Sequence, residues 1–232
     1  MSFLWLTLTV LVFAALVKLG FWQNSRALEK EIRLSKIEQL GSRRPLSLSE
    51  VNSLAINENI NDMPVIITGS FAKKIVLLLD NQVNTGQLGY RVYQVMTTKE
   101  HAVLVNLGWI KGAHKRDELP KIDALKGKYS IRGNVRLIEV GMQLKEQTFT
   151  AEQWPIRIQQ VELDKLSLLI NKQLLPYAIY LDQHEKIGYI KNWQPIVMPP
   201  EKHRAYAFQW FSLAATWLIL MLWAKFGASK KA

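Results

Sequence analysis

The residue best suited to chemistry is His203, which lies just before an apolar stretch near the C-terminus. A neutral imidazole is a good axial ligand for haem iron, and the chain has no cysteine whose thiolate would compete. On a helix that advances about 100° per residue, Tyr206, Trp210, Ala214 and Trp217 fall within about 60° of His203. This face is flat and aromatic, so the spacing indicates a surface against which a porphyrin could lie.

The same face fits a second interpretation that needs no cofactor. Tryptophan and tyrosine gather where a membrane-spanning helix meets the lipid headgroups, and a histidine suits that level as well. Residue chemistry alone favours this aromatic belt over an iron ligand by roughly two to one. Both interpretations stay open at the level of residue types.

A second group of candidate residues follows the first apolar stretch. Trp22, Arg26, Lys30 and Arg33 are spaced by three or four residues and therefore share one face of a helix. Their cations would suit haem propionates or acidic subunits of a partner protein. Contact of snorkelling basic side chains with lipid headgroups explains them equally well.

The chain lacks the patterns that mark common catalytic and metal sites. Its four histidines show no metal-ligand spacing, and it has neither a Gly-x-Ser-x-Gly elbow nor a phosphate-cradling glycine loop. The absence of cysteine excludes disulfides, thiolate metal sites, iron–sulfur clusters and haem attached through thioethers. We therefore expect that the protein is not an enzyme, and an anchored hydrolase with unrecognised catalytic residues is the weakest alternative.

Two apolar stretches must position the candidate residues. Residues 3–22 carry one charge, Lys18, and residues 205–224 carry none. Each would span about 30 Å as a helix, which matches the hydrocarbon core of a bilayer. The first stretch lacks the basic n-region and cleavage site of a signal peptide, and no Arg-rich transit leader is present. We predict two uncleaved spans in a bacterial membrane protein, with everything between them on one side.

The charge of the chain bears on its partners. The formal net charge is +11, but the basic residues are scattered singly or in pairs such as Arg43–Arg44. Nucleic-acid binding domains instead cluster their basic residues on one face with aromatic residues between them. We therefore expect no nucleic acid, and contact with anionic membrane lipids or acidic partner proteins.

The segment between the spans is rich in strand signals. Alternating or β-branched apolar runs predict strands at residues 65–71, 74–80, 90–98, 102–110, 129–140, 177–181 and 187–192. Ser47 with Glu50 predicts a capped short helix, and the apolar spacing of residues 161–174 predicts a second helix. Gly133 indicates a bulge, and Asn106, Gly108 and Trp109 indicate a strand end and tight turn with a packed tryptophan. The expected fold class is a small antiparallel barrel or sandwich with helical additions (α+β), flanked by two transmembrane helices.

The predicted organisation follows from these elements. It consists of a transmembrane helix at 1–23, a helical extension at 24–44, a β-rich domain at 45–195, a proline-containing linker at 196–204, a second transmembrane helix at 205–224 and a basic tail at 225–232.

Several passages resemble the surfeit-locus family of cytochrome c oxidase assembly proteins. They are residues 19–23 with Arg26 and Lys30, 68–71, 86–90, 103–110, 131–136, Trp154 with 164–169, and 203–211. Each passage alone is unspecific, but their order and spacing cover nearly the whole chain. Two positions depart from the family pattern, because Leu107 replaces an arginine and Lys202 replaces an asparagine.

The resemblance implies a function and a site. It implies an assembly factor that helps to insert or retain haem a during maturation of the catalytic subunit of a haem–copper oxidase, with haem a synthase as a second partner. It implies His203 as the iron ligand, and with it Tyr206 and Trp210 as walls and Arg26 and Lys30 as charge partners. The alternative is a scaffold without haem that binds an oxidase subunit or another respiratory-complex subunit during assembly.

The resemblance also implies the location of the chain, which is the bacterial inner membrane with the central domain in the periplasm. A count of basic residues beside the spans favours the opposite orientation, because Arg26, Lys30 and Arg33 lie on the domain side. Long domains cross membranes largely regardless of charge, so we expect the periplasmic orientation.

Overall fold

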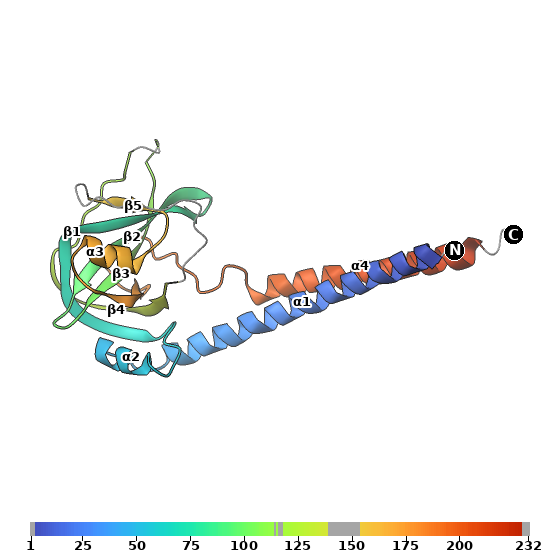
Figure 1. Cartoon of the computed structure of the whole chain (residues 1–232), viewed down its shortest axis with the longest axis horizontal. Helices are drawn as coiled ribbons and strands as arrows, with labels where there is room; N and C mark the ends of the chain where they lie inside the picture. Colours follow the sequence, from blue (N-terminus) through green and yellow to red (C-terminus); the bar gives the residue numbers. More distant parts are fainter. Residues whose placement is uncertain (1–2, 114, 116–117, 139–153, 229–232) are drawn as a thin grey trace. The chain divides into compact units, whose positions relative to one another are not determined.

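The computed structural model describes residues 3–113, 115, 118–138 and 154–228. The chain forms two compact units. One comprises Met1–Glu38 with Gln194–Ala232, and the other comprises Gln39–Trp193. The first unit holds two long helices and the second holds a barrel (Figure 1).

The two helices are α1 (Phe3–Gly41) and α4 (Pro200–Ala228). Both are long and apolar enough to cross a membrane, by length and composition. The 39 residues of α1 would extend about 58 Å, which exceeds a hydrocarbon core, so its polar second half continues beyond the apolar part. The helix α4 begins at Pro200, a residue preorganised for the first helical position. Residues 200–204, which were expected to end the linker, belong to α4.

The second unit is a five-stranded barrel. Its strands and their additions are β1 (Pro64–Asn84), β2 (Gln87–Thr97), β3 (Ala102–Lys111), β4 (Gly127–Leu137), β5 (Ile156–Ile158) and β6 (Leu174–Leu181). The order β2-β3-β6-β4-β1 closes because β1 pairs with both β4 and β2. The prediction of a β-rich domain is confirmed, and the barrel rather than the sandwich is observed. The pairing of β3 with β6 is parallel, so the barrel is not wholly antiparallel.

The barrel has an inner and an outer apolar layer. Inward-facing side chains such as Val92, Val105 and Ile179 are fully buried and fill the interior. A second buried cluster, which includes Leu77, Leu104 and Leu166, lies where β5 and α3 (Leu163–Leu169) pack on the strands. The strands of this face are thus apolar on both sides, as expected when a sheet is covered on both faces.

Several strand predictions change at their ends. Residues 65–71 and 74–80 belong to one long strand, β1, whose register with β2 shifts between Phe71 and Val76. The turn that follows is only Thr85–Gly86, and both residues have positive φ, as a tight I′ hairpin requires. Residues 187–192 form no strand of the barrel but bridge β3 through Ile190 and Trp109.

The predicted bulge at Gly133 is wrong. Gly133 pairs in unbroken register with Val65 on one side and Leu181 on the other. A glycine is needed because an added Cβ would lie 2.4 Å from the carbonyl oxygen of Tyr180. The bulge lies in β3 instead, where Asn106 Oδ1 accepts a 2.8 Å hydrogen bond from the Gly108 amide. The tight feature predicted there is therefore inside the strand rather than at its end.

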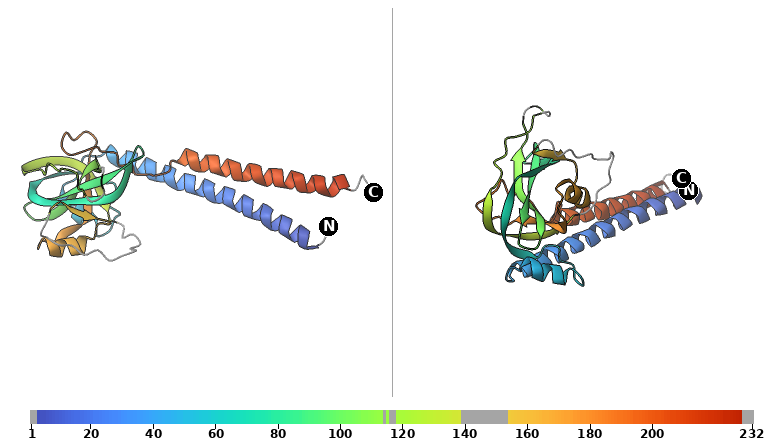
Figure 2. Two further views of the ribbon diagram at one scale, coloured as in Figure 1. Left: turned by 90° about the horizontal axis from the view of Figure 1, so that it is seen from above. Right: turned by 60° about the vertical axis from the view of Figure 1, so that its left-hand side comes forward.

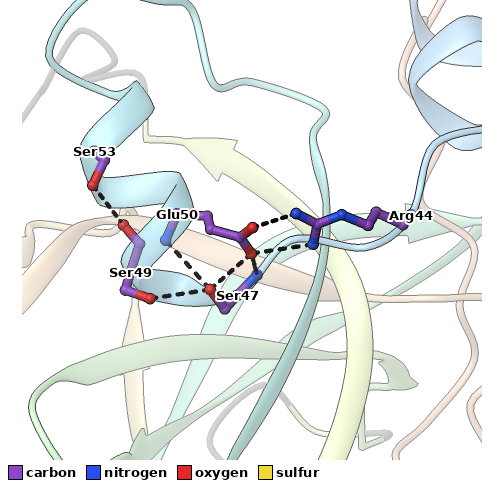
Figure 3. A network of polar contacts seen from close by, with 5 residues as sticks. All are labelled: Arg44, Ser47, Ser49, Glu50 and Ser53. Carbon is purple, nitrogen blue, oxygen red and sulfur yellow. Dashed lines mark hydrogen bonds and ion pairs between the residues drawn. The ribbon is translucent and has the colours of Figure 1, made fainter.

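The predicted capping box is confirmed at the start of α2 (Leu48–Leu54). Glu50 accepts a 2.8 Å hydrogen bond from the amide of Ser47, whose hydroxyl accepts from the amide of Glu50 (Figure 3). The hydrogen bonds that Arg44 donates lower the pKa of Glu50 to about 2. Farther along α2, the buried Tyr177 of β6 donates a 2.7 Å hydrogen bond to Asn52. The capping box stabilises the start of α2 locally, and the bond from Tyr177 joins α2 to the barrel.

Candidate functional site

The helices α1 and α4 meet along one face of each. On α4 the buried and half-buried side chains recur every three or four residues, and they are His203, Ala207, Trp210, Ala214, Trp217 and Met221. On α1 the matching positions include Thr9, Gly20, Gln23 and Ala27. The start of α1 lies beside the end of α4 (Figure 2), so the pair is antiparallel. We call this contact face the seam.

His203 meets Gln23 in the seam. Its Nδ1 lies 2.8 Å from Gln23 Oε1, and the side chain is only 9% exposed. An amide oxygen accepts hydrogen bonds and cannot donate, so the proton of the neutral ring lies on Nδ1. The lone pair is then on Nε2, which has no hydrogen-bond partner among the described residues. Metal-ligating histidines are held in this way, with one ring nitrogen bound to the protein and the other directed to the metal.

The far end of the seam is occupied by contacts between the helices. Trp217 donates its indole N–H to the carbonyl oxygen of Thr9 at 3.2 Å, and Ala214 is 3% exposed. These two residues of the expected porphyrin face therefore pack against α1. Tyr206 is 46% exposed and Trp210 is half-buried. The part of the face that remains open is the part next to His203.

The middle of the seam depends on a glycine. The ring of Phe211 packs over Gly20, and an added Cβ there would lie 2.6 Å from it. Phe21 meets the same ring edge-on, with 5.2 Å between the centroids. Close contact of this kind is typical of paired membrane helices, which approach over small residues.

The basic residues near the site are paired with acids on α1. Arg26 forms a 2.6 Å ion pair with Glu29 and lies over the ring of Trp22. Arg204 of α4 forms a 2.7 Å ion pair with Glu31. These pairs are solvent-exposed and therefore weak, so an incoming carboxylate can compete for either guanidinium. Lys30 is half-buried.

Residue types and spacing alone give no role to Gln23, Glu31 or Arg204. Gln23 belongs to the Gly-x-Trp-Gln passage that carried part of the family resemblance. The signal in the sequence for Gln23 was its position, because it is a polar residue at the end of an apolar stretch and shares a helical face with Gly20 and Ala27. The partner of Arg204 lies far away in the sequence, so no local pattern connects it with Glu31.

The described residues contain no group of three or more His, Asp or Glu side chains that could hold a metal ion. The remaining chemistry of the site is therefore that of one oriented imidazole beside aromatic and basic side chains.

Comparison with known proteins shows the family of this chain. A model of the SURF1 family matches residues 10–215, which include part of each helix and the whole barrel. The chain belongs to the SURF1 family. A SURF1-like protein of Rickettsia felis is 30% identical over 109 residues, which are 46% of this chain. The matched segment covers 46% of the length of that relative, which is about half. The resemblance found in the sequence is thus confirmed.

Proposed function

We propose that this SURF1-family chain assists maturation of a haem–copper oxidase by holding haem a beside the seam, with His203 as axial ligand. The observation that supports this most is the bond between His203 Nδ1 and Gln23, because it leaves Nε2 as the free ring nitrogen. When bound, haem would supply an iron that takes a nitrogen ligand and two propionates that accept charged hydrogen bonds. The residues present fit both needs.

Each residue of the proposed site has its own part. Gln23 orients the imidazole, and Tyr206 and Trp210 flank it with aromatic surface. Arg26 and Lys30 are the cations proposed for the propionates. Because Arg26 is paired with Glu29, a propionate would replace that exposed carboxylate. The protein binds and releases the haem without catalysing a reaction.

We also propose that α1 and α4 cross the bacterial inner membrane and hold the barrel in the periplasm. Their outward-facing apolar side chains support insertion in lipid. The chain has no cysteine, so single cysteines can report the orientation. Glu100→Cys on the barrel should react with a membrane-impermeant maleimide in intact spheroplasts, and Lys225→Cys should react only after lysis. The reverse pattern would overturn the orientation.

A scaffold without haem is the second candidate. One observation favours it, since protein residues cover about nine-tenths of His203. In that case the bond between Gln23 and His203 serves to join the helices, and the oxidase subunit is the only ligand.

Haem content separates the two candidates. The full chain should be expressed in a host that makes haem a, purified in detergent, and its haem measured by optical spectrum per chain. We expect His203→Ala to lose most haem at unchanged protein level, whereas His184→Ala, an exposed histidine of the barrel, should keep it. Trp210→Ala should lower occupancy more than Trp223→Ala, which is exposed far along α4. Equal haem in His203→Ala and wild type would favour the scaffold.

A further inference from the structure

The outer surface of the barrel carries a cleft of about 780 Å³. Its walls are the start of α2, the first part of β1 and the turn between β2 and β3. All of these residues lie within the barrel unit. We call it the β1 cleft.

The hydrogen-bond pairing of β1 is interrupted on one side of the strand at this cleft. Neighbouring residues of a strand direct their N–H and C=O groups to opposite sides. On the cleft side, Pro64 and Ile66 bond to Leu46, and Ser70 pairs with Thr97 of β2. Thr68 lies between these two pairings and directs its N–H and C=O the same way. Among the described residues no strand covers Thr68 on that side, which leaves a short open edge.

The side chains around this open edge suit an extended ligand. Ile66 is 40% exposed, and Thr68 and Ser70 beside it are also exposed. Ile66 offers an apolar contact and Ser70 a hydroxyl, whereas the hydroxyl of Thr68 donates a 3.1 Å hydrogen bond to Ser130. An added strand presents its own side chains with the same period of two.

The charge of the β1 cleft is basic. Lys99 and Lys128 line it and are exposed, and Glu100 is the one acidic residue among those lining it. A third base, Lys172, donates a 3.1 Å hydrogen bond to the hydroxyl of Thr97 at the border. The ring of His101 is already bound to Asn52 at 3.2 Å. Two exposed ammonium groups are therefore available for anions.

We propose that the β1 cleft binds an extended, acidic peptide segment of a partner protein, which adds a short strand to β1 at Thr68. Main-chain hydrogen bonds to Thr68 provide binding, as in other cases of strand addition. Lys99 and Lys128 select acidic side chains over basic ones. The cleft is in this account the surface by which the barrel recognises a client.

A proline substitution tests the backbone contact. Thr68→Pro removes the N–H that faces the cleft, whereas the ladder with β4 uses the odd-numbered residues Val65, Ile67 and Gly69. Thr68→Val keeps the N–H and is the matched control. The probe is a fluorescent ten-residue peptide of alternating glutamate and valine, titrated against the full chain in nanodiscs of neutral lipid. We expect Thr68→Pro to bind at least tenfold more weakly than wild type, and Thr68→Val to bind within twofold.

Charge reversal tests the selectivity without touching the backbone. Lys99→Glu with Lys128→Glu should weaken binding at least tenfold, whereas Lys121→Glu, an exposed lysine outside the cleft, should bind within twofold. A peptide of alternating lysine and valine should not bind wild type. If Thr68→Pro loses the wild-type circular dichroism spectrum, the charge variants decide the question.

Three results would overturn the proposal. They are absence of binding by the glutamate–valine peptide, equal binding by the lysine–valine peptide, and equal binding by the folded Thr68→Pro chain. Binding to phosphatidylglycerol vesicles that needs Lys99 and Lys128 but not the Thr68 amide, without peptide binding, would assign the cleft to lipid instead.

Discussion

The barrel and the helix pair use their polar side chains in different ways. In the barrel, the fully buried Gln94 donates to the carbonyl oxygens of Ala72 and Leu125 and accepts from the amide of Leu125. In the seam, His203 uses one ring nitrogen for Gln23 and leaves the other without a partner. Gln94 is thus a structural polar group of the barrel, whereas the second ring nitrogen of His203 is the one that our proposal assigns to a ligand.

The two regions also differ in what surrounds their apolar side chains. Those of the barrel, such as Leu78 and Val103, are buried within the protein. Many on the helices, such as Phe3 and Trp223, are more than 70% exposed. Substitutions in the barrel should hence act on its own folding stability, and substitutions in the seam should act on helix contact and haem.

The largest effect should come from the buried ion pair of the barrel. Asp62 pairs with Arg136, which is 6% exposed and stacks on the ring of Trp193 at 3.3 Å from its centroid. Asp62→Ala leaves a buried guanidinium without this carboxylate and should lower the free energy of unfolding by about 3–5 kcal/mol. Urea unfolding of the full chain in detergent, followed by tryptophan fluorescence, measures it.

The matched control is Glu29→Ala, which breaks the exposed ion pair of α1. It should leave the urea midpoint of the barrel unchanged, because exposed pairs contribute little. An Asp62→Ala midpoint equal to that of wild type would remove the distinction between the two regions.

The next largest effect should come from substitution of Gly133, where an added side chain would face the backbone of a neighbouring strand. At Gly133 an added side chain meets the carbonyl oxygen of Tyr180, which cannot move without opening the barrel. Gly133→Val should lower the free energy of unfolding by about 1–3 kcal/mol. Gly41→Ala, with open space around it, should be near neutral in the same urea experiment. A neutral Gly133→Val would show that β4 and β6 can separate freely.

Substitution of Gly20 should have a smaller effect, because an added Cβ there would face a side chain and not the backbone. At Gly20 the obstacle is the ring of Phe211, which can rotate away. The test uses the pair Thr9→Cys and Met221→Cys, whose native side chains lie 3.5 Å apart. Gly20→Ala should lower the yield of this disulfide by no more than about twofold, because interhelical contacts are individually weak. Complete loss of the crosslink would show that the seam is as tightly packed as the barrel.

The smallest effect concerns the capping box of α2. Glu50 has a pKa of about 2 in the folded chain, lowered by Arg44, and a higher pKa when unfolded. Ionised Glu50 therefore stabilises the folded chain fully above its unfolded pKa of about 4.3. This stabilisation is lost as the pH falls through about 2. A carboxyl-carbon NMR titration of Glu50 measures this pKa, and Arg44→Ala should raise it. An unchanged pKa in Arg44→Ala would show that Ser47 alone holds the carboxylate.

Local signals in the sequence predicted much of the fold. The capping box of Ser47 and Glu50 and the strand cores were visible because they depend on neighbouring residues. Barrel closure, the parallel pairing of β3 with β6 and the reason for Gly133 depend on segments that meet only in space. The short strand β5 has three residues, too few for a periodic pattern.

The candidate site shows the same division. His203 was identified from its residue type, its place beside an apolar stretch and the family resemblance. Its partner Gln23 lies 180 positions away, so the bond that sets its tautomer has no local signal. The partial covering of the expected aromatic face had no local signal either, because helical spacing shows which residues share a face but not what packs on it.

Chemical rescue of His203→Ala tests the central claim most directly. If the imidazole is an iron ligand, free imidazole at millimolar concentration should restore haem binding to the purified His203→Ala chain, with the optical spectrum of a nitrogen-ligated haem. Restored occupancy in His203→Ala, with no effect of imidazole on wild type, is the result that we predict. A His203→Ala chain that keeps its haem without imidazole, or that stays empty with it while still inserting and folding, would contradict the role of His203 as the axial ligand.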